Sequence, residues 1–275
     1  MHVLITNDDG VDSPGIHTLA KVAVDLGLTV TVGAPSWDSS GASASLTSVQ
    51  SEGKVLIEER RIEGLDPKTQ VFAVEAAPAF IAFLAAGGGF GEPPDLVLSG
   101  INRGANTGQV VLHSGTVGAA LTARTHGLPA IAFSLDVRGV RGDDDLHWDT
   151  AAAVAHRVIG ATLEGMRPMV LNVNVPDVPL VELRGLRRAH LASQGQVQAT
   201  VTEVGSGYVK LTYDQPSAVD EPGSDAALLA DGYATFTPLR TVCEADDVSG
   251  LLDLVGTNAG IDALDGDRDG LQLDG

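Results

Sequence analysis

The chain has 275 residues, 44% of them hydrophobic, and carries a formal net charge of −19 at pH 7. This length and apolar content allow a large buried core, and there is neither a run of roughly 20 apolar residues that could span a bilayer nor a basic leader followed by an apolar segment. Because nucleic-acid binding needs a basic footprint and Cys243 is the only cysteine, we expect a cytoplasmic protein without disulfides that binds neither nucleic acids nor membranes.

The first predicted element is a short strand over residues 3–5, followed at once by a turn rich in carboxylates. Its continuous apolar run is typical of a strand that is buried on both faces of a parallel sheet. Asp8 and Asp9 can converge only if the chain turns after this strand, and Gly10 permits the turn. Ligands of open α/β sheets bind beyond the carboxyl ends of the strands, so we expect chemistry at this turn.

Further helices and strands alternate as far as residue 180. The sequence predicts helices at residues 13–27, 78–86, from 114 and at 149–163, and strands at 29–33, 71–74, 95–99, 129–134 and 169–175. The charged residues 52–65 are expected at a sheet edge or on the surface. This alternation predicts an α/β fold with a doubly wound, mostly parallel sheet.

The pattern changes beyond Pro179. Residues 183–214 alternate between polar and apolar, with turn points at Gly195, Gly205 and Gly207, which predicts a β-hairpin arm followed by a helix at 226–233 and a strand at 234–238. An arm that cannot bury its own surface is usually covered by another subunit, so we expect a homo-oligomer. The Gly- and Asp-rich tail from about residue 257 is predicted to be disordered.

The acidic turn admits two interpretations. Asp8, Asp9 and Asp12 could simply favour the positive end of the following helix, at about 0.3–1 kcal/mol each. Two adjacent carboxylates at the mouth of a buried strand repel one another, however, and a divalent cation would relieve that repulsion. Oxygen ligands without a nearby His or Cys favour magnesium or manganese. The loops around Ser40 and Asn102 also follow predicted strands and can supply neutral oxygens, although each alone resembles an ordinary turn.

A candidate anion site lies further along the chain. The Gly- and Asn-rich residues 100–108 leave a strand, and Ser114 then begins a helix whose first N–H groups are free. Gly115 lets a ligand approach the backbone there. The glycines at 87–89 follow a helix instead of a strand, so they do not form a phosphate-binding loop of the usual order. A lone histidine such as His113 is more often structural than functional.

Several other classes of enzyme or binding site fit the sequence less well. The turn lacks the Asp-x-Asp-x-Thr/Val pattern of haloacid-type phosphatases, the glycines of a dinucleotide fingerprint and the His ligands of a zinc amidohydrolase. There is no Gly-x-Ser-x-Gly nucleophile elbow. Residues 265–270 match the first half of a calcium loop, but the acidic twelfth position would fall beyond residue 275.

Taken together, these residues resemble the SurE family of survival-protein nucleotidases, which are metal-dependent phosphatases of nucleoside monophosphates. The matching motifs follow the family's order over roughly residues 1–240 and lie at 5–16, 34–35 with 40–43, 99–106, 114–120, 171–176, and 232–233 with 237–239. The resemblance implies a single domain over 1–240, with a Rossmann-like core at 1–180 and a hairpin arm and helix for oligomerisation at 181–240. An extension over 241–275 would follow.

The resemblance also implies the site. It places one divalent ion per subunit on Asp8, Asp9, Ser40 and Asn102, and it places the phosphate near Asn7, Asn106, Ser114, Gly115 and Thr116. The expected reaction is hydrolysis of a nucleoside monophosphate by a metal-activated water that Asp8 orients. Asn7, Asn106 and Ser114 would stabilise the charge that develops on the phosphate. The expected assembly is a homodimer or homotetramer formed through the C-terminal arm.

This chain departs from the family pattern at four places. Residues 76–81 replace Gly-Thr-Pro-Ala-Asp-Cys, Gln109 and His113 replace an acidic residue and a Tyr, and Ser36-Trp37-Asp38 replaces an Asp-x-Asn pattern. These departures motivate an alternative hypothesis, in which the protein binds a nucleotide or a metal in the same crevice without turnover. The preferred base, the 5′ or 3′ position and activity on polyphosphate are left open by the sequence.

Overall fold

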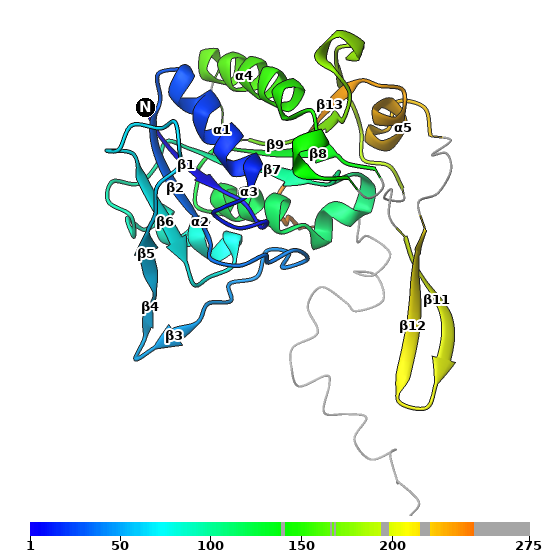
Figure 1. Ribbon diagram of the computed structural model, residues 1–275, viewed down its shortest axis with the longest axis horizontal. Coiled ribbons are helices and arrows are strands. Elements are labelled where there is room, and N and C mark those ends of the chain that lie inside the picture. The colour runs from blue at the N-terminus through cyan, green and yellow to red at the C-terminus, as the bar shows by residue number, and fades with distance from the viewer. Residues whose placement is uncertain (139–140, 166, 168, 194–197, 215–220, 245–275) are drawn as a thin grey trace, which may run out of the picture. The chain divides into compact units, whose positions relative to one another are not determined.

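The computed structural model describes residues 1–138, 141–165, 167, 169–193, 198–214 and 221–244 (Figure 1). The chain divides into two units, Met1–Thr241 and Val242–Gly275, and only residues 242–244 of the second are described. The tail from residue 257 and the half calcium loop at 265–270 therefore lie outside the described residues.

Nine strands of the described chain form one sheet in the order β10-β13-β9-β8-β7-β1-β2-β6-β5. Their bounds are β1 (His2–Thr6), β2 (Thr29–Pro35), β5 (Ile57–Glu59), β6 (Gln70–Val74), β7 (Leu96–Arg103), β8 (Ala130–Asp136), β9 (Val170–Pro176), β10 (Leu186–Arg188) and β13 (Ala234–Leu239). Neighbouring strands are parallel except for β5 with β6 and β13 with β9. The predicted mostly parallel α/β sheet is confirmed, and its strand order reverses at β1 as in doubly wound sheets.

Helices cover both faces of this sheet. α1 (Pro14–Asp25) and α4 (Trp148–Glu164) pack together, and α2 (Pro78–Ala86) and α3 (Gly115–Thr125) pack together in a second pair (Figure 1). Val3 and Ile5 of β1 belong to the hydrophobic core under the first pair, whereas Leu4 belongs to the core under the second. Successive strand side chains point to opposite faces, and both faces are buried here, which explains the continuous apolar run.

The C-terminal part differs from the sequence-based prediction. β11 (Gln198–Gly205) and β12 (Tyr208–Asp214) form the expected antiparallel hairpin. β10 lies inside the predicted arm, yet it joins the main sheet parallel to β13, so the arm prediction was wrong there. The reason is that Leu186 packs against the main core, and alternation alone does not reveal a strand's partner. The helix expected at 226–233 is shorter, α5 (Asp225–Ala230), because Gly232 has a left-handed φ of 83°.

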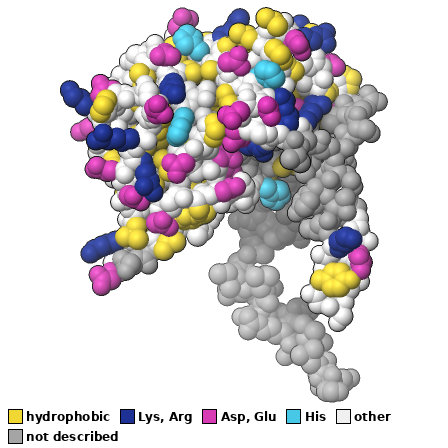
Figure 2. All heavy atoms as spheres, in the orientation of Figure 1, with side chains coloured by type: hydrophobic (Ala, Val, Ile, Leu, Met, Phe, Trp, Pro, Cys, Tyr) yellow, Lys and Arg dark blue, Asp and Glu magenta, His cyan; other side chains and the backbone are white. Residues whose placement is uncertain are grey.

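The remaining described elements are short. They are β3 (Gln50–Ser51), β4 (Lys54–Val55) and the 3-10 turns η1 (Gly108–His113), η2 (Asp143–Asp145) and η3 (Leu180–Glu182). The charged segment 52–65 supplies the edge strand β5, as expected. Among the described helices, none is both long and apolar enough to cross a membrane. Figure 2 shows Asp and Glu side chains spread over one face with Lys and Arg between them.

Candidate active site

Three loops meet at the carboxyl edge of the sheet, because β1 lies between β2 and β7. The backbone N–H of Ser39, in the loop after β2, donates to the carbonyl of Asp8 at 2.7 Å. The N–H of Arg103, at the end of β7, donates to Asp9 Oδ2 at 3.1 Å. The acidic turn is thus joined to both neighbouring loops by main-chain hydrogen bonds, in the place where the sequence predicted the chemistry.

Asp8 is held against the first turn of α3. Its side chain is buried, and Thr116 Oγ1 donates a hydrogen bond to Asp8 Oδ1. A Cβ at position 115 would lie 2.8 Å from Asp8 Oδ2, so only glycine fits beside this carboxylate. Ser114 caps the helix, because its Oγ accepts a hydrogen bond from Val117 N at 3.1 Å. The structure therefore brings the carboxylate turn and the expected anion site at the start of α3 into direct contact.

The two adjacent carboxyl groups both have raised pKa values. Burial raises the pKa of Asp8. Burial first and the charge of Asp8 second raise the pKa of Asp9 to about 7, and the hydrogen bond from Arg103 N only partly opposes this. Ionising both groups at neutral pH is therefore unfavourable in the protein alone. A bound cation would remove that cost by compensating both negative charges.

We expect this raised pKa to appear as a pH-dependent stability difference between the parent and Asp9→Asn. The protonated Asp9 carboxyl stabilises the fold fully below its unfolded pKa of 3.8, and this contribution is lost as pH rises through the folded pKa of about 7. Without metal, the variant should therefore gain stability over the parent as pH rises across that interval. At about pH 8 the gain should be roughly 2 kcal/mol, after allowing for the solvent-facing part of the carboxylate.

Urea unfolding of both proteins in chelator, at about pH 4 and about pH 8, measures this difference and cancels the contributions of titrating groups that do not interact with Asp9. Equal stability differences at the two pH values would show that folding does not raise the pKa of Asp9.

The donor set around the turn fits an oxygen-ligated cation. The Ser40 hydroxyl donates to Asp38 Oδ1 at 2.5 Å, and Asn102 Nδ2 donates to Gly104 O at 2.7 Å, which leaves the Ser40 and Asn102 side-chain oxygens free to act as ligands. Within the described residues, no group of three or more His, Cys, Asp or Glu side chains is arranged to hold a metal. A cation here would therefore rest on two carboxylates and neutral oxygens, the chemistry that magnesium and manganese accept.

Asn7 is already engaged inside the turn. Its Nδ2 donates to Gly10 O at 2.9 Å and to Ser13 Oγ at 2.7 Å. Its Oδ1 is buried and has no hydrogen-bond partner among the described residues. As placed, Asn7 offers its surroundings an acceptor oxygen instead of the donor expected for a phosphate contact, and it shapes the bend that lets the two carboxylates converge.

Asn106 is fixed by a buried polar network on β8 and β9. Its backbone N–H donates to Asn174 Oδ1 at 2.8 Å, and its Nδ2 donates to Ser134 Oγ at 2.8 Å. Its carbonyl accepts hydrogen bonds from Asn172 Nδ2 at 2.7 Å and Asn174 Nδ2 at 2.9 Å. These partners of Asn106 were not predicted from the sequence. The available signal was a pair of asparagines at alternate positions of an otherwise apolar strand, which implies buried polar groups that need partners.

Asp225 of α5 holds the other end of the same loop. This carboxylate is fully buried, and its Oδ2 accepts a hydrogen bond from Gly108 N at 2.9 Å. Its Oδ1 accepts from Ala192 N at 2.9 Å and from Ala226 N at 2.8 Å. The loop that carries Asn106 towards Ser114 is thus held by residues from three distant parts of the chain. Gln109 and His113, where the family pattern is broken, are exposed on this loop.

Comparison with known proteins extends these observations. A family model described as "Survival protein SurE" matches residues 3–199. The protein of Alkalilimnicola ehrlichii named "5′-nucleotidase SurE" is 38% identical over 245 residues, covering 87% of this chain and 89% of that protein. The Legionella pneumophila protein of the same name is also 38% identical, covering 87% of this chain and 91% of that protein.

A solved structure agrees with these sequence matches. The SurE protein from Aquifex aeolicus superposes with a TM-score of 0.73 at 29% identity, covering 93% of this chain and all of that one. The similarity therefore extends over most of the chain, and the family match includes every site residue that the sequence predicted, although Asp225 lies beyond the matched range.

Proposed function

This chain belongs to the SurE family, and on that premise we propose that it is a 5′-nucleotidase that hydrolyses nucleoside monophosphates to nucleoside and phosphate. The observation that carries the proposal is the buried Asp8 carboxylate, hydrogen-bonded to the first turn of α3 and followed directly by the partly buried Asp9. This arrangement places a cation-binding pair against a helix N-terminus that suits a phosphate. Relatives that bear the name 5′-nucleotidase SurE support the same activity.

We propose that Asp8, Asp9, Ser40 and Asn102 hold one divalent ion per subunit, magnesium or manganese. When bound, such an ion supplies Lewis acidity that polarises a phosphate oxygen and activates a water. Two features of the chain support this ligand set. Burial and the neighbouring charge of Asp8 raise the pKa of Asp9, so a cation beside the pair would be favourable. Ser40 and Asn102 each donate their own hydrogens elsewhere, which leaves oxygen lone pairs for a cation.

The chain's own residues then have distinct roles. Asp8 orients the attacking water through its carboxylate, which is buried beside the first turn of α3. Thr116 keeps this carboxylate in place through its hydroxyl. The backbone N–H groups at Gly115 and Thr116 and the side chains of Asn106 and Ser114 stabilise charge on the phosphate oxygens. Asn7 contributes to this charge stabilisation only if it gives up one of its two bonds within the turn.

A phosphate-release screen tests the proposal. The purified protein is assayed against nucleoside 5′- and 3′-monophosphates and short polyphosphates, with magnesium, with manganese and with chelator. We expect release from nucleoside monophosphates that depends on the added ion and is abolished by chelator. Metal-dependent nucleotide binding in calorimetry without any phosphate release would instead identify the alternative, a nucleotide-binding protein that has lost turnover.

Cytoplasmic location and assembly into a homodimer or homotetramer through the C-terminal arm belong to the same proposal. The β11–β12 hairpin supports the assembly, because Val201, Val204, Tyr208 and Val209 expose more than half of their surface in the single chain. Sedimentation of the full chain, compared with a variant that carries both Val204→Asp and Val209→Asp, measures the size of the assembly. We expect the parent to be larger than the variant, because the added charges oppose burial of the arm.

A further inference from the structure

A pocket opens beside Asp9, between the first residues of α1 and the segment 143–148. Its volume is about 330 Å³, and its polar and aromatic lining comes from Asp9, Asp12, Asp38, Arg103, Asp143 and Trp148. Ligand pockets in proteins start at about 300 Å³, so this one accommodates a single small group. Because Asp9 lines the pocket and also belongs to the carboxylate pair, a group in the pocket would lie next to the proposed phosphate site.

Trp148 gives the pocket a flat apolar wall in a fixed orientation. Its indole Nε1 donates to the carbonyl of Asp143 at 3.1 Å. On another side the ring packs close to α1, since a Cβ at position 15 would lie 3.2 Å from Trp148 Cζ3. An immobilised aromatic face in an otherwise polar pocket is a surface on which a planar base can stack.

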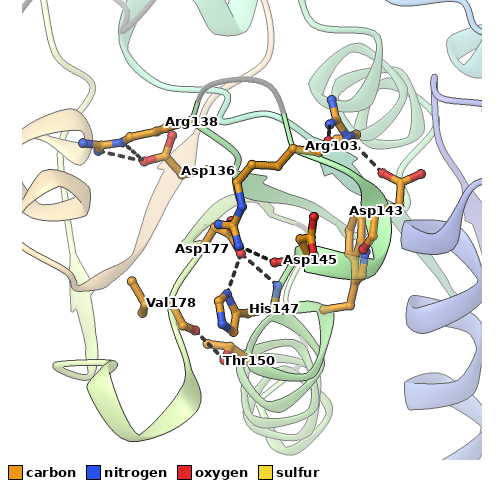
Figure 3. Close-up of polar contacts among 11 residues, drawn as sticks. Arg103, Asp136, Arg138, Asp143, Asp145, His147, Thr150, Asp177 and Val178 are labelled. Atoms are coloured by element: carbon orange, nitrogen blue, oxygen red, sulfur yellow. Dashed lines mark hydrogen bonds and ion pairs between the residues drawn. The ribbon is translucent and has the colours of Figure 1, made fainter.

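The segment 143–148, which carries Trp148, is anchored by hydrogen bonds and ion pairs to a buried carboxylate. Asp177, which is 3% exposed at its side chain, accepts hydrogen bonds from the N–H and Nδ1 of His147, both at 2.8 Å, and from Arg141. Arg103 Nε donates to Asp143 Oδ1 at 3.0 Å (Figure 3). The backbone N–H of Arg103 donates to Asp9 Oδ2. The pocket wall and the carboxylate pair are therefore fixed relative to one another before any ligand arrives.

The negative charge of the pocket lining determines which ligand groups can bind there. Asp12, Asp38 and Asp143 bring three carboxylates besides Asp9, and the only cationic side chain in the lining, Arg103, is already paired with Asp143. Hydroxyl and amino donors, such as those of a ribose or a base, can bond these carboxylates. A second phosphate group in the same space would be repelled.

We propose that this pocket receives the nucleoside part of the substrate, with the base against Trp148, and that its acidic lining disfavours leaving groups that carry further phosphates. The inference rests on the proposed function, which puts the phosphate at Asp8 and Asp9. It makes the enzyme selective for monophosphates whose leaving group is uncharged.

Binding without turnover provides the first test. Trp37 is the other tryptophan of the chain, so in a Trp37→Phe background the fluorescence reports on Trp148 alone. Titration with adenosine should change this emission saturably, and adenosine 5′-monophosphate should do the same, whereas ribose should have no effect. Emission that stays constant with both adenine compounds overturns the proposal.

Kinetics provide the second test. Trp148→Ala should raise KM for adenosine 5′-monophosphate by about tenfold or more, corresponding to the loss of one base-stacking contact, with kcat little changed. Trp148→Phe should restore most of the affinity, and KM for ribose 5-phosphate should be the same in all three proteins. Asp12→Asn should raise kcat/KM for adenosine diphosphate relative to the monophosphate. Asp25→Asn, at the end of α1 and outside the pocket, is the charge control.

The outcomes separate the two proposals. A saturable emission change without phosphate release from any substrate would support nucleoside binding in the pocket and contradict the proposed nucleotidase activity. Phosphate release with an unchanged KM in Trp148→Ala would support the proposed nucleotidase activity and contradict the binding of the base against Trp148.

Discussion

Asp9→Asn is expected to lower kcat/KM for nucleoside monophosphates by at least about 100-fold, because even the groups that support metal ligands typically contribute 10–100-fold. The substitution keeps the size of the side chain and its bond from Arg103 N but removes the charge that a cation needs. Manganese binding measured by calorimetry should weaken in parallel. The same variant should be more stable than the parent at about pH 8 without metal, so lost activity and gained stability together exclude misfolding as the cause.

Asp25→Asn provides the matched control for this experiment. Asp25 ends α1 on the surface, away from the carboxylate pair, and its substitution makes the same change in net charge. We expect parental activity and parental metal affinity from this control. An Asp9→Asn enzyme as active as its Asp25→Asn counterpart would falsify the proposed metal site.

A second large decrease in activity is expected from a substitution at Gly115, where the backbone of α3 contacts the Asp8 carboxylate. In Gly115→Ala the new methyl group would lie 2.8 Å from both Cβ and Oδ2 of Asp8, so the carboxylate or the helix must move. Displacements of about 1 Å at a reacting group can cost about 100-fold in rate. We therefore expect a decrease of that order in kcat/KM, measured by phosphate release.

Gly160→Ala in α4 makes the same chemical change where, apart from the helix's own neighbouring backbone, no atom lies within 4 Å of the added methyl group. It should leave the activity unchanged and increase stability by about 0.4–1 kcal/mol through the loss of backbone freedom in the unfolded chain. If Gly115→Ala behaves like Gly160→Ala, α3 does not support Asp8 in the way the structure implies.

Local sequence patterns were sufficient to predict the core of the fold. The run at residues 3–5 is apolar at every position because β1 is covered on both faces, and this signal requires only neighbouring residues. The meeting of the loops after β1, β2 and β7 was also predictable, since parallel strands end at one edge, and the structure joins these loops through Ser39 N and Arg103 N. The helix that begins at Ser114 followed from its capping residue, which the structure shows bonded to Val117 N.

Long-range partners were not predictable in this way. Nothing near Asn106 in the sequence shows that Asn174 will accept its N–H, because the two residues lie 68 positions apart. For the same reason, the strand pattern could not assign β10 to the main sheet, where its partner β13 lies more than forty residues away. The pocket beside Asp9 likewise depends on Trp148, which only the folding of β8 and α4 around the sheet brings to α1.

The hydrogen bond from Gly108 N to Asp225 has a consequence for synthesis of the protein on the ribosome. The proposed ligands Asp8 and Asp9 are made early relative to the rest of the site, because the loop beside them is held by the side chain of Asp225, which is made more than two hundred residues later. β13, which pairs with β9 in the sheet, emerges later still. A nascent chain that stops before α5 therefore carries all of its proposed ligands and phosphate-binding residues without the anchor that fixes their loop, so we expect competence for catalysis only after α5 has been made.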